Sequence, residues 1–189
     1  DPIEYVYDNA CSVVEQRELH SDTLEFAAAL KAAMRESPDI IMVGEMRDIA
    51  TMSSALTAAE TGHLVLATIH TNSAPQTVDR IIDSFPPSQQ NQIRQQLSGA
   101  LLGVISQRLL PRLDGCGRVA AFEVMIGTPP IQSLIREGKT HMLQSAIETA
   151  SKDGMITLRK ALELLSMNGL VSRKETLRFS ADYKETEAF

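Results

Sequence analysis

The sequence predicts an α/β fold, with a parallel sheet and flanking helices in its first half. Two short apolar runs, Ile40–Val43 and Leu64–Ala67, lie on either side of a helix-forming stretch at residues 50–60. This β-α-β pattern is typical of a parallel sheet with a right-handed crossover. Two further β-like runs, residues 105–110 and 119–126, are joined by a glycine-rich turn and predict a β-hairpin.

The N-terminal segment is expected to leave a strand and continue as an irregular or hairpin stretch over residues 1–20. A helix is predicted over residues 23–36, where apolar side chains recur at helical spacing. Asp22 and Glu25 have the spacing of a capping box at its start. Ser37 precedes Pro38, which ends the helix because a residue before proline avoids the helical region.

Beyond the second apolar run, helices are predicted over residues 76–83 and 88–103. The pattern after the hairpin is helical throughout, with Ser172 and Glu175 forming another capping box. A soft boundary near Gly127 divides the chain into an α/β core, residues 1–127, and a helical C-terminal part, residues 128–189.

Composition excludes several classes of function. The net charge is −6 and the isoelectric point about 5.2, which argues against nucleic acid as a partner because phosphate neutralisation needs a basic surface. Cys11 and Cys116 are far apart and lack metal-ligand spacing, so a structural zinc site and a disulfide framework are not expected. No apolar run reaches about 18 residues, so no membrane insertion is predicted. We expect a cytoplasmic protein.

Polar side chains follow both apolar runs of the first half. Glu45 comes just after the first, and Thr68 and His70 follow the second. Because ligands of parallel sheets bind outside the carboxyl ends of the strands, these residues indicate one site. A carboxylate there can orient a water for attack on a phosphoryl group. Two structural alternatives stay open: Glu45 pairs with Arg47 or caps the next helix, and His70 is an ordinary hydrogen-bonded histidine.

Three further residues are weaker candidates. Glu4 brings a second acid near a predicted strand exit, where it could hold magnesium-bound water, and its alternative is a turn acid. Arg80, on the helix after His70, could neutralise phosphate charge, although a helix arginine is more often a solvated ion-pair partner. His63 could hydrogen-bond the sheet edge. The chain contains no G-x-x-x-x-G-K-[ST] phosphate loop.

Together these segments resemble the motifs of the secretion and type IV pilus ATPases. DPIEYVY resembles their acidic box, PDIIMVGEMRD their atypical Walker B motif, and TGHLVLATIHTNSAPQTVDRIID their histidine box. PPIQSLIREGK is similar to the AIRNLIRE signature of the pilus retraction ATPases, with Pro130, Gln132 and Ser133 in place of its alanine, arginine and asparagine. The resemblance implies a partial RecA-like P-loop ATPase core, ATP and Mg²⁺ as cofactors, and a homo-hexamer that powers pilus retraction and twitching motility.

The resemblance also implies roles for single residues. Glu45 takes the place of the Walker B glutamate and general base, and Glu4 that of the acidic-box glutamate near magnesium. His70 and His63 fall at histidine-box positions, with His70 the phosphate sensor, and Arg80 matches the arginine that ends the box. The expected partner is the inner-membrane platform protein of the pilus, which would recruit the protein to the inner face of the membrane.

Other machines with the same engine remain open: a pilus-extension ATPase, a type II secretion ATPase or a retraction paralogue. The first two typically carry a four-cysteine zinc insertion, which the chain's 2 cysteines cannot build. An alternative from another functional class is a non-catalytic module that docks on the platform protein. Because the phosphate loop is expected upstream of Asp1, we expect this piece alone to bind ATP poorly, to turn it over negligibly and to self-associate.

Overall fold

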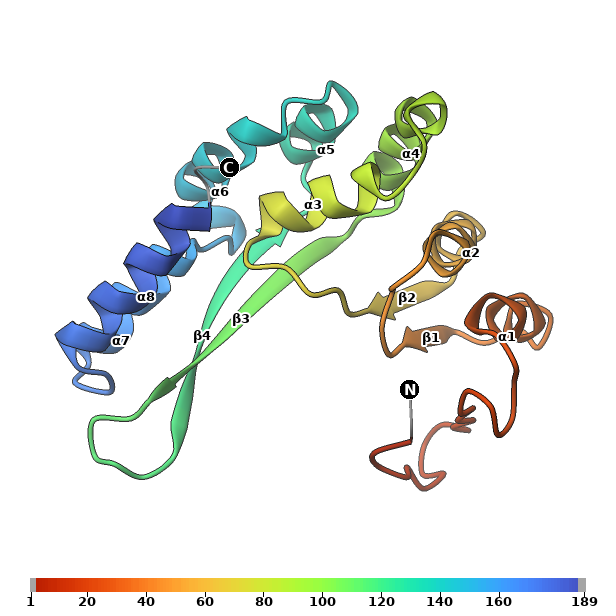
Figure 1. Cartoon of the computed structure of the whole chain (residues 1–189), viewed down its shortest axis with the longest axis horizontal. Helices are drawn as coiled ribbons and strands as arrows, with labels where there is room; N and C mark the ends of the chain where they lie inside the picture. The colour runs from red at the N-terminus through yellow and green to blue at the C-terminus, as the bar shows by residue number, and fades with distance from the viewer. Residues whose placement is uncertain (1–2, 187–189) are drawn as a thin grey trace. The chain divides into compact units, whose positions relative to one another are not determined.

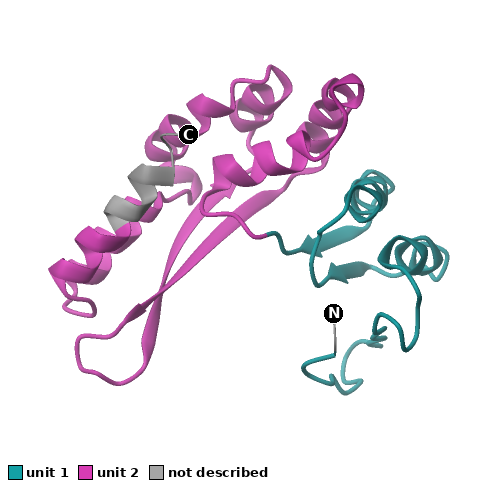
Figure 2. Ribbon diagram, in the orientation of Figure 1, with its two compact units in different colours: residues 1–69 teal, residues 70–189 magenta. Residues whose placement is uncertain are grey.

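The computed structural model describes residues 3–186, with side chains described up to residue 179. The chain forms two compact units, residues 1–69 and 70–189 (Figure 2). The boundary predicted near Gly127 lies inside the second unit and stays a prediction. None of the helices in the described part of the chain has the length and apolar character needed to cross a membrane.

The first unit is built on two short parallel strands, β1 (Ile40–Val43) and β2 (Leu64–Ala67) (Figure 1). Their register runs from Ile40 opposite Leu64 to Val43 opposite Ala67. The helices are α1 (Phe26–Ala33) and α2 (Ile49–Glu60), and the core joins side chains from α1, β1 and α2, namely Leu30, Ile41, Val43 and Ala58.

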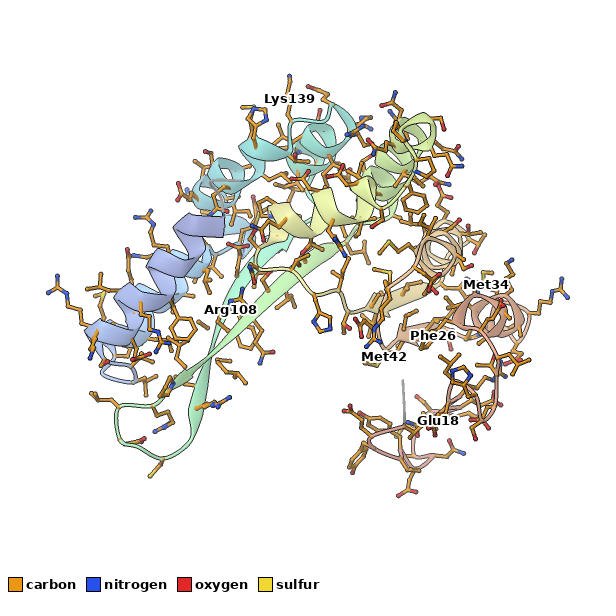
Figure 3. The ribbon with its side chains drawn as sticks, in the orientation of Figure 1. Glu18, Phe26, Met34, Met42, Arg108 and Lys139 are labelled. Carbon is orange, nitrogen blue, oxygen red and sulfur yellow. The ribbon has the colours of Figure 1, made fainter. Side chains whose placement is uncertain are left out.

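The opposite face of β1 is exposed. Successive side chains of a strand point to opposite faces, so burial of Ile41 and Val43 leaves the alternate positions outside. Ile40 is 58% exposed and Met42, labelled in Figure 3, is 71% exposed. The first unit therefore presents an apolar strand face to solvent.

The N-terminal segment is irregular, which is one of the two forms that the sequence predicted, but the capping of the helix that follows differs from the prediction. Residues 3–25 contain no strand, and the loop is closed by Gln16, whose side chain accepts from the Tyr7 amide (2.9 Å) and donates to the Tyr5 carbonyl (2.8 Å). The predicted capping box is wrong, because the Asp22 carboxylate accepts from the Glu18 amide (2.8 Å) in a turn. Helix α1 therefore begins later than predicted.

The second unit starts with two helices and a hairpin. Helices α3 (Ala74–Asp83) and α4 (Pro87–Ala100) precede β3 (Gly103–Pro111) and β4 (Arg118–Ile126), which run side by side as a long antiparallel pair (Figure 1). Gly103, predicted to end α4, instead begins β3. A Cβ there would lie 2.9 Å from the Met125 carbonyl oxygen, so close strand pairing requires glycine.

Helices make up the rest of the described chain: α5 (Pro129–Arg136), η1 (Thr140–Met142), α6 (Leu143–Thr149), η2 (Ser151–Asp153), α7 (Leu158–Met167) and α8 (Arg173–Thr186). Helix α7 packs on β4 and α8. The core here includes Leu110, Ala121, Leu158, Leu162 and Val171. The Ser172 hydroxyl accepts from the Glu175 amide (3.3 Å), which is the first half of the predicted capping box.

Candidate functional site

The exits of β1 and β2 are hydrogen-bonded to each other. The Thr68 amide donates to the Val43 carbonyl (3.4 Å), and the Met46 amide donates to the Thr68 carbonyl (3.0 Å). The Thr68 hydroxyl donates to the Gly44 carbonyl. These bonds flank Glu45 on both sides in the chain. The structure thus brings Glu45 and Thr68 together at the carboxyl ends of the two strands, as the sequence predicted.

Glu45 itself is largely buried, with a side chain 13% exposed. Its Oε2 lies 2.5 Å from the guanidinium of Arg47, whose side chain is 70% exposed. The hydrogen bond to Glu45 raises the pKa of Arg47. The pairing that the sequence left open as an alternative therefore exists, and it leaves the carboxylate at the sheet edge.

Asp48, not Glu45, caps helix α2. Its Oδ1 accepts from the Thr51 amide (2.8 Å) and its Oδ2 from the Thr51 hydroxyl (2.7 Å). These bonds, the backbone one first, lower the pKa of the Asp48 carboxyl because they favour its charged form. Asp48 is thus the residue that caps α2, and Glu45 has no part in capping that helix.

His63 lies at the other end of β2. It precedes the strand, with Nδ1 3.1 Å from the Ala58 carbonyl oxygen and 3.3 Å from the Thr61 hydroxyl, where α2 ends. Five residues of extended chain, from His63 to Thr68, span roughly 16 Å. The structure therefore does not bring His63 to the strand ends that carry Glu45.

Glu4 is exposed in the irregular N-terminal segment. No hydrogen bond or ion pair joins it to another described residue. The predicted strand exit is not formed around it within residues 3–25. Its place near magnesium stays a prediction.

In the second unit, the polar segment that follows Ile69 is fixed to α3 and β3. The Thr71 and Thr77 hydroxyls lie 2.6 Å apart, and the Asn72 amide donates to the Gln76 side chain (3.3 Å). Arg108 of β3, labelled in Figure 3, donates to Asn72 Oδ1. This anchoring holds the segment that begins with His70.

His70 and Arg80 are both exposed. Helix α3 buries Val78, Ile81 and Ile82, so Arg80 lies on its outer face. Both side chains are accessible to a ligand. Their predicted roles as phosphate sensor and phosphate-neutralising arginine remain predictions.

Sequence reasoning missed Glu123, which is fully buried on β4. Its Oε1 accepts from the Ala74 amide (2.7 Å) and its Oε2 from the Leu158 amide (3.3 Å). The signal was present in the sequence: an acid stands at an inward position of an apolar strand, between Ala121 and Met125. A buried carboxylate needs hydrogen-bond donors, so such an acid predicts a junction with other elements.

The comparison with protein families gives the class of the protein. The family model of the type II/IV secretion system proteins matches residues 1–118. The chain therefore belongs to the type II/IV secretion system protein family.

Within that family, the chain is similar to pilus retraction proteins. It is 53% identical to the type IV pilus retraction ATPase PilT of Pseudomonas aeruginosa over 174 residues, which are 92% of this chain and 50% of that protein. It is 48% identical over 189 residues to a twitching motility protein of Neisseria gonorrhoeae, covering 100% of this chain and 50% of that one. The chain thus spans about half the length of these relatives.

A solved structure agrees with the same family. The crystal structure of the pilus retraction motor PilT with bound ADP matches with a TM-score of 0.88 at 48% identity, over 100% of this chain and 53% of that one. The predicted fold class, a partial RecA-like ATPase core with a hairpin and a helical C-terminal part, is confirmed. So is the likeness to the retraction subgroup that the motifs indicated.

Proposed function

We propose that this chain is the C-terminal portion of a hexameric motor ATPase that powers type IV pilus retraction and twitching motility. The observation that carries the proposal is the hydrogen-bonded pair of strand exits, which holds Glu45 at the carboxyl ends of β1 and β2. Membership of the family and the likeness to the PilT relatives support the reaction class.

In this proposal Glu45 is the general base. Its carboxylate accepts a proton from the water that attacks the γ-phosphate, and the neighbouring Arg47 guanidinium restricts its orientation. The backbone bonds around Met46 and Thr68 fix the segment that carries it. Phosphoryl transfer depends chiefly on positioning and charge stabilisation, so a fixed carboxylate is the group that the reaction needs.

The residues at the strand ends fit ATP with Mg²⁺. When bound, Mg²⁺ neutralises phosphate charge, and it is usually held by one or two carboxylates with water and phosphate oxygens. The Thr68 hydroxyl donates its proton to Gly44, so it offers oxygen lone pairs that suit a cation better than a phosphate. Thr68 would hold the ion directly and Glu45 through a bound water, so that the Glu45 carboxylate can still accept a proton. No cluster of three or more His, Cys, Asp or Glu occurs in the described residues.

His70 and Arg80, both in the second unit, are the proposed phosphate-binding residues. Both are exposed, and both can donate hydrogen bonds to phosphate oxygens. Arg80 can bind two such oxygens at once through its planar fork. The homo-hexamer and the inner-membrane platform protein are proposed partners on the likeness to the PilT relatives.

The test is phosphate release from ATP by the full-length protein. Arg80→Ala should lower turnover at least about tenfold, because an arginine that stabilises transition-state charge contributes strongly to phosphoryl transfer. The matched control is Arg159→Ala, another exposed helix arginine of the second unit, which pairs with Glu148. Wild-type protein without ATPase activity, or equal effects of the two substitutions, would contradict the proposal.

A further inference from the structure

Glu123 lies where a carboxylate is costly. Its side chain is fully buried on β4, between the inward positions of Ala121 and Met125. A buried polar group of this kind is tolerated only with hydrogen-bond donors around it. The Ala74 and Leu158 amides provide them, at 2.7 and 3.3 Å. Glu123 therefore receives its donors from two different helices.

Both donors are the first residues of their helices, α3 and α7. Helix N-terminal amides lack partners within the helix, and the helix dipole favours an anion there. Each helix also has a cap of its own: the Ser73 hydroxyl accepts from the Gln76 amide and the Thr157 hydroxyl accepts from the Lys160 amide, both at 3.3 Å. Capping is thus supplied locally, and the distinct contribution of Glu123 is to join the two helix starts.

The two helices belong to different parts of the second unit. Helix α3 carries Arg80 and follows directly on the polar segment that begins with His70. Helix α7 belongs to the C-terminal helices and buries Leu158 and Leu162 in their core. The chain before α7 is also fixed to β4, because Val124 and Ile156 exchange backbone hydrogen bonds of 2.9 and 3.1 Å.

We propose that Glu123 is a positioning residue that couples the α3 start, and with it His70 and Arg80, to the C-terminal helices through α7. The coupling depends only on the hydrogen bonds that join the starts of the two helices to Glu123. Its purpose in turnover rests on the proposed function, in which His70 and Arg80 contact phosphate. A shift of α7 is then transmitted to the phosphate-contacting residues through one rigid carboxylate.

The decisive variant is Glu123→Gln in the 189-residue chain, read by amide hydrogen exchange with NMR detection. The amide side chain has the same shape but loses the charge, and its NH₂ group opposes one of the two donors. Loss of a hydrogen bond to a charged group changes an equilibrium constant, here that of the local opening which exposes the amide, by roughly tenfold or more. We expect exchange at both Ala74 and Leu158 to become about tenfold faster or more.

The matched control is Thr157→Ala, which removes a cap from α7 and keeps the Glu123 carboxylate in the chain. It should speed exchange in the first turn of α7 and leave Ala74 unchanged. Glu123→Asp, which keeps the charge but is shorter, should protect one of the two amides and not both. Unchanged exchange at Ala74 in Glu123→Gln would overturn the coupling, and so would unchanged exchange at both Ala74 and Leu158 in Glu123→Asp if the glutamine variant does not fold.

The second readout is ATP hydrolysis by the full-length protein. Glu123→Gln should lower kcat about tenfold with the KM for ATP within about twofold, while Thr157→Ala keeps wild-type values. A purely structural role would leave kcat intact in folded protein, and that result would overturn the positioning role. Wild-type protein without hydrolysis would refute the proposed function alone, because the exchange measurement still decides the coupling.

Discussion

Replacing Glu45 by glutamine separates its two possible roles, which are general base in ATP hydrolysis and ion-pair partner of Arg47. The substitution keeps the shape of the side chain and removes the negative charge that can accept a proton. It also weakens the contact with Arg47, whose guanidinium lies 2.5 Å from Glu45 Oε2. Arg47→Ala is the matched control, because it removes the same ion pair and leaves the carboxylate in place.

The two roles differ in magnitude. The ion pair has one partner that is 70% exposed, and solvent screening leaves such pairs with little effect on the free energy of unfolding. Loss of a general base lowers a rate by about 10² to 10⁴, which is about 3 to 5 kcal/mol in activation free energy. A catalytic effect is therefore larger than any effect of the lost pair.

The assay is steady-state ATP hydrolysis by the full-length protein, with nucleotide binding measured separately. Glu45→Gln should lower kcat by about a hundredfold or more while ATP binding is retained. Arg47→Ala should change kcat by less than about fivefold. Unchanged turnover in Glu45→Gln would remove Glu45 from the mechanism, and equal losses in both variants would show that the ion pair is what matters.

Three other predictions concern the helix start, the surface of α5 and the exposed strand. Asp48→Ala should lower the free energy of unfolding by about 1 kcal/mol at neutral pH. Because the folded-state pKa of Asp48 lies below its ordinary 3.8, this contribution is present above about pH 4 and is lost as pH falls through the folded pKa; thermal unfolding at pH 7 and pH 2 checks it, and a pH-independent loss contradicts it. Charge reversal at Arg136 or Glu137, both exposed at the end of α5, should preserve ATPase activity and impair twitching motility, whereas equal loss of both activities would refute the separation. The 189-residue chain should self-associate through the face of Ile40 and Met42, which are 58% and 71% exposed, and lysine at both positions should restore a monomer in analytical ultracentrifugation; a monomeric wild type would contradict this.

The β1–α2–β2 unit could be predicted from sequence because its signals are local. Each strand is a short apolar run followed by polar residues, and the intervening helix ends at Glu60, two residues before Gly62, which adopts a φ of +99°. The positions of Glu45 and Thr68 follow from the same rule of strand ends. The hydrogen bond between Thr68 and Gly44 could not be predicted, because it joins residues that follow different strands.

The helix boundaries that were predicted wrongly depend on contacts between residues distant in sequence or on competing turns. Asp22 has a capping spacing, but a turn containing His20, at φ 68°, directs its carboxylate to the Glu18 amide instead. The helix predicted over residues 88–103 included Gly103, yet Gly103 pairs with Ile126 and so belongs to β3. Local spacing alone therefore predicts neither the partner of Asp22 nor the element that contains Gly103.

Glu123 shows a different kind of failure. Its position in an alternating strand marks it as a buried acid, but its partners begin helices 49 and 35 residues away in the chain. Sequence pattern can thus indicate that such an acid needs donors without saying which ones. Only the packing of α3 and α7 on β4 identifies them.

The most direct test of the account is calorimetric titration of Mg²⁺-ATP into the 189-residue chain and into the full-length protein. The chain contains no phosphate loop, and the backbone amides and lysine of such a loop hold the phosphates in this class of site. We expect binding by the full-length protein and negligible binding by the chain alone. Comparable binding by the chain would show that it holds the phosphates itself, and no binding by the full-length protein would contradict the proposed ATPase.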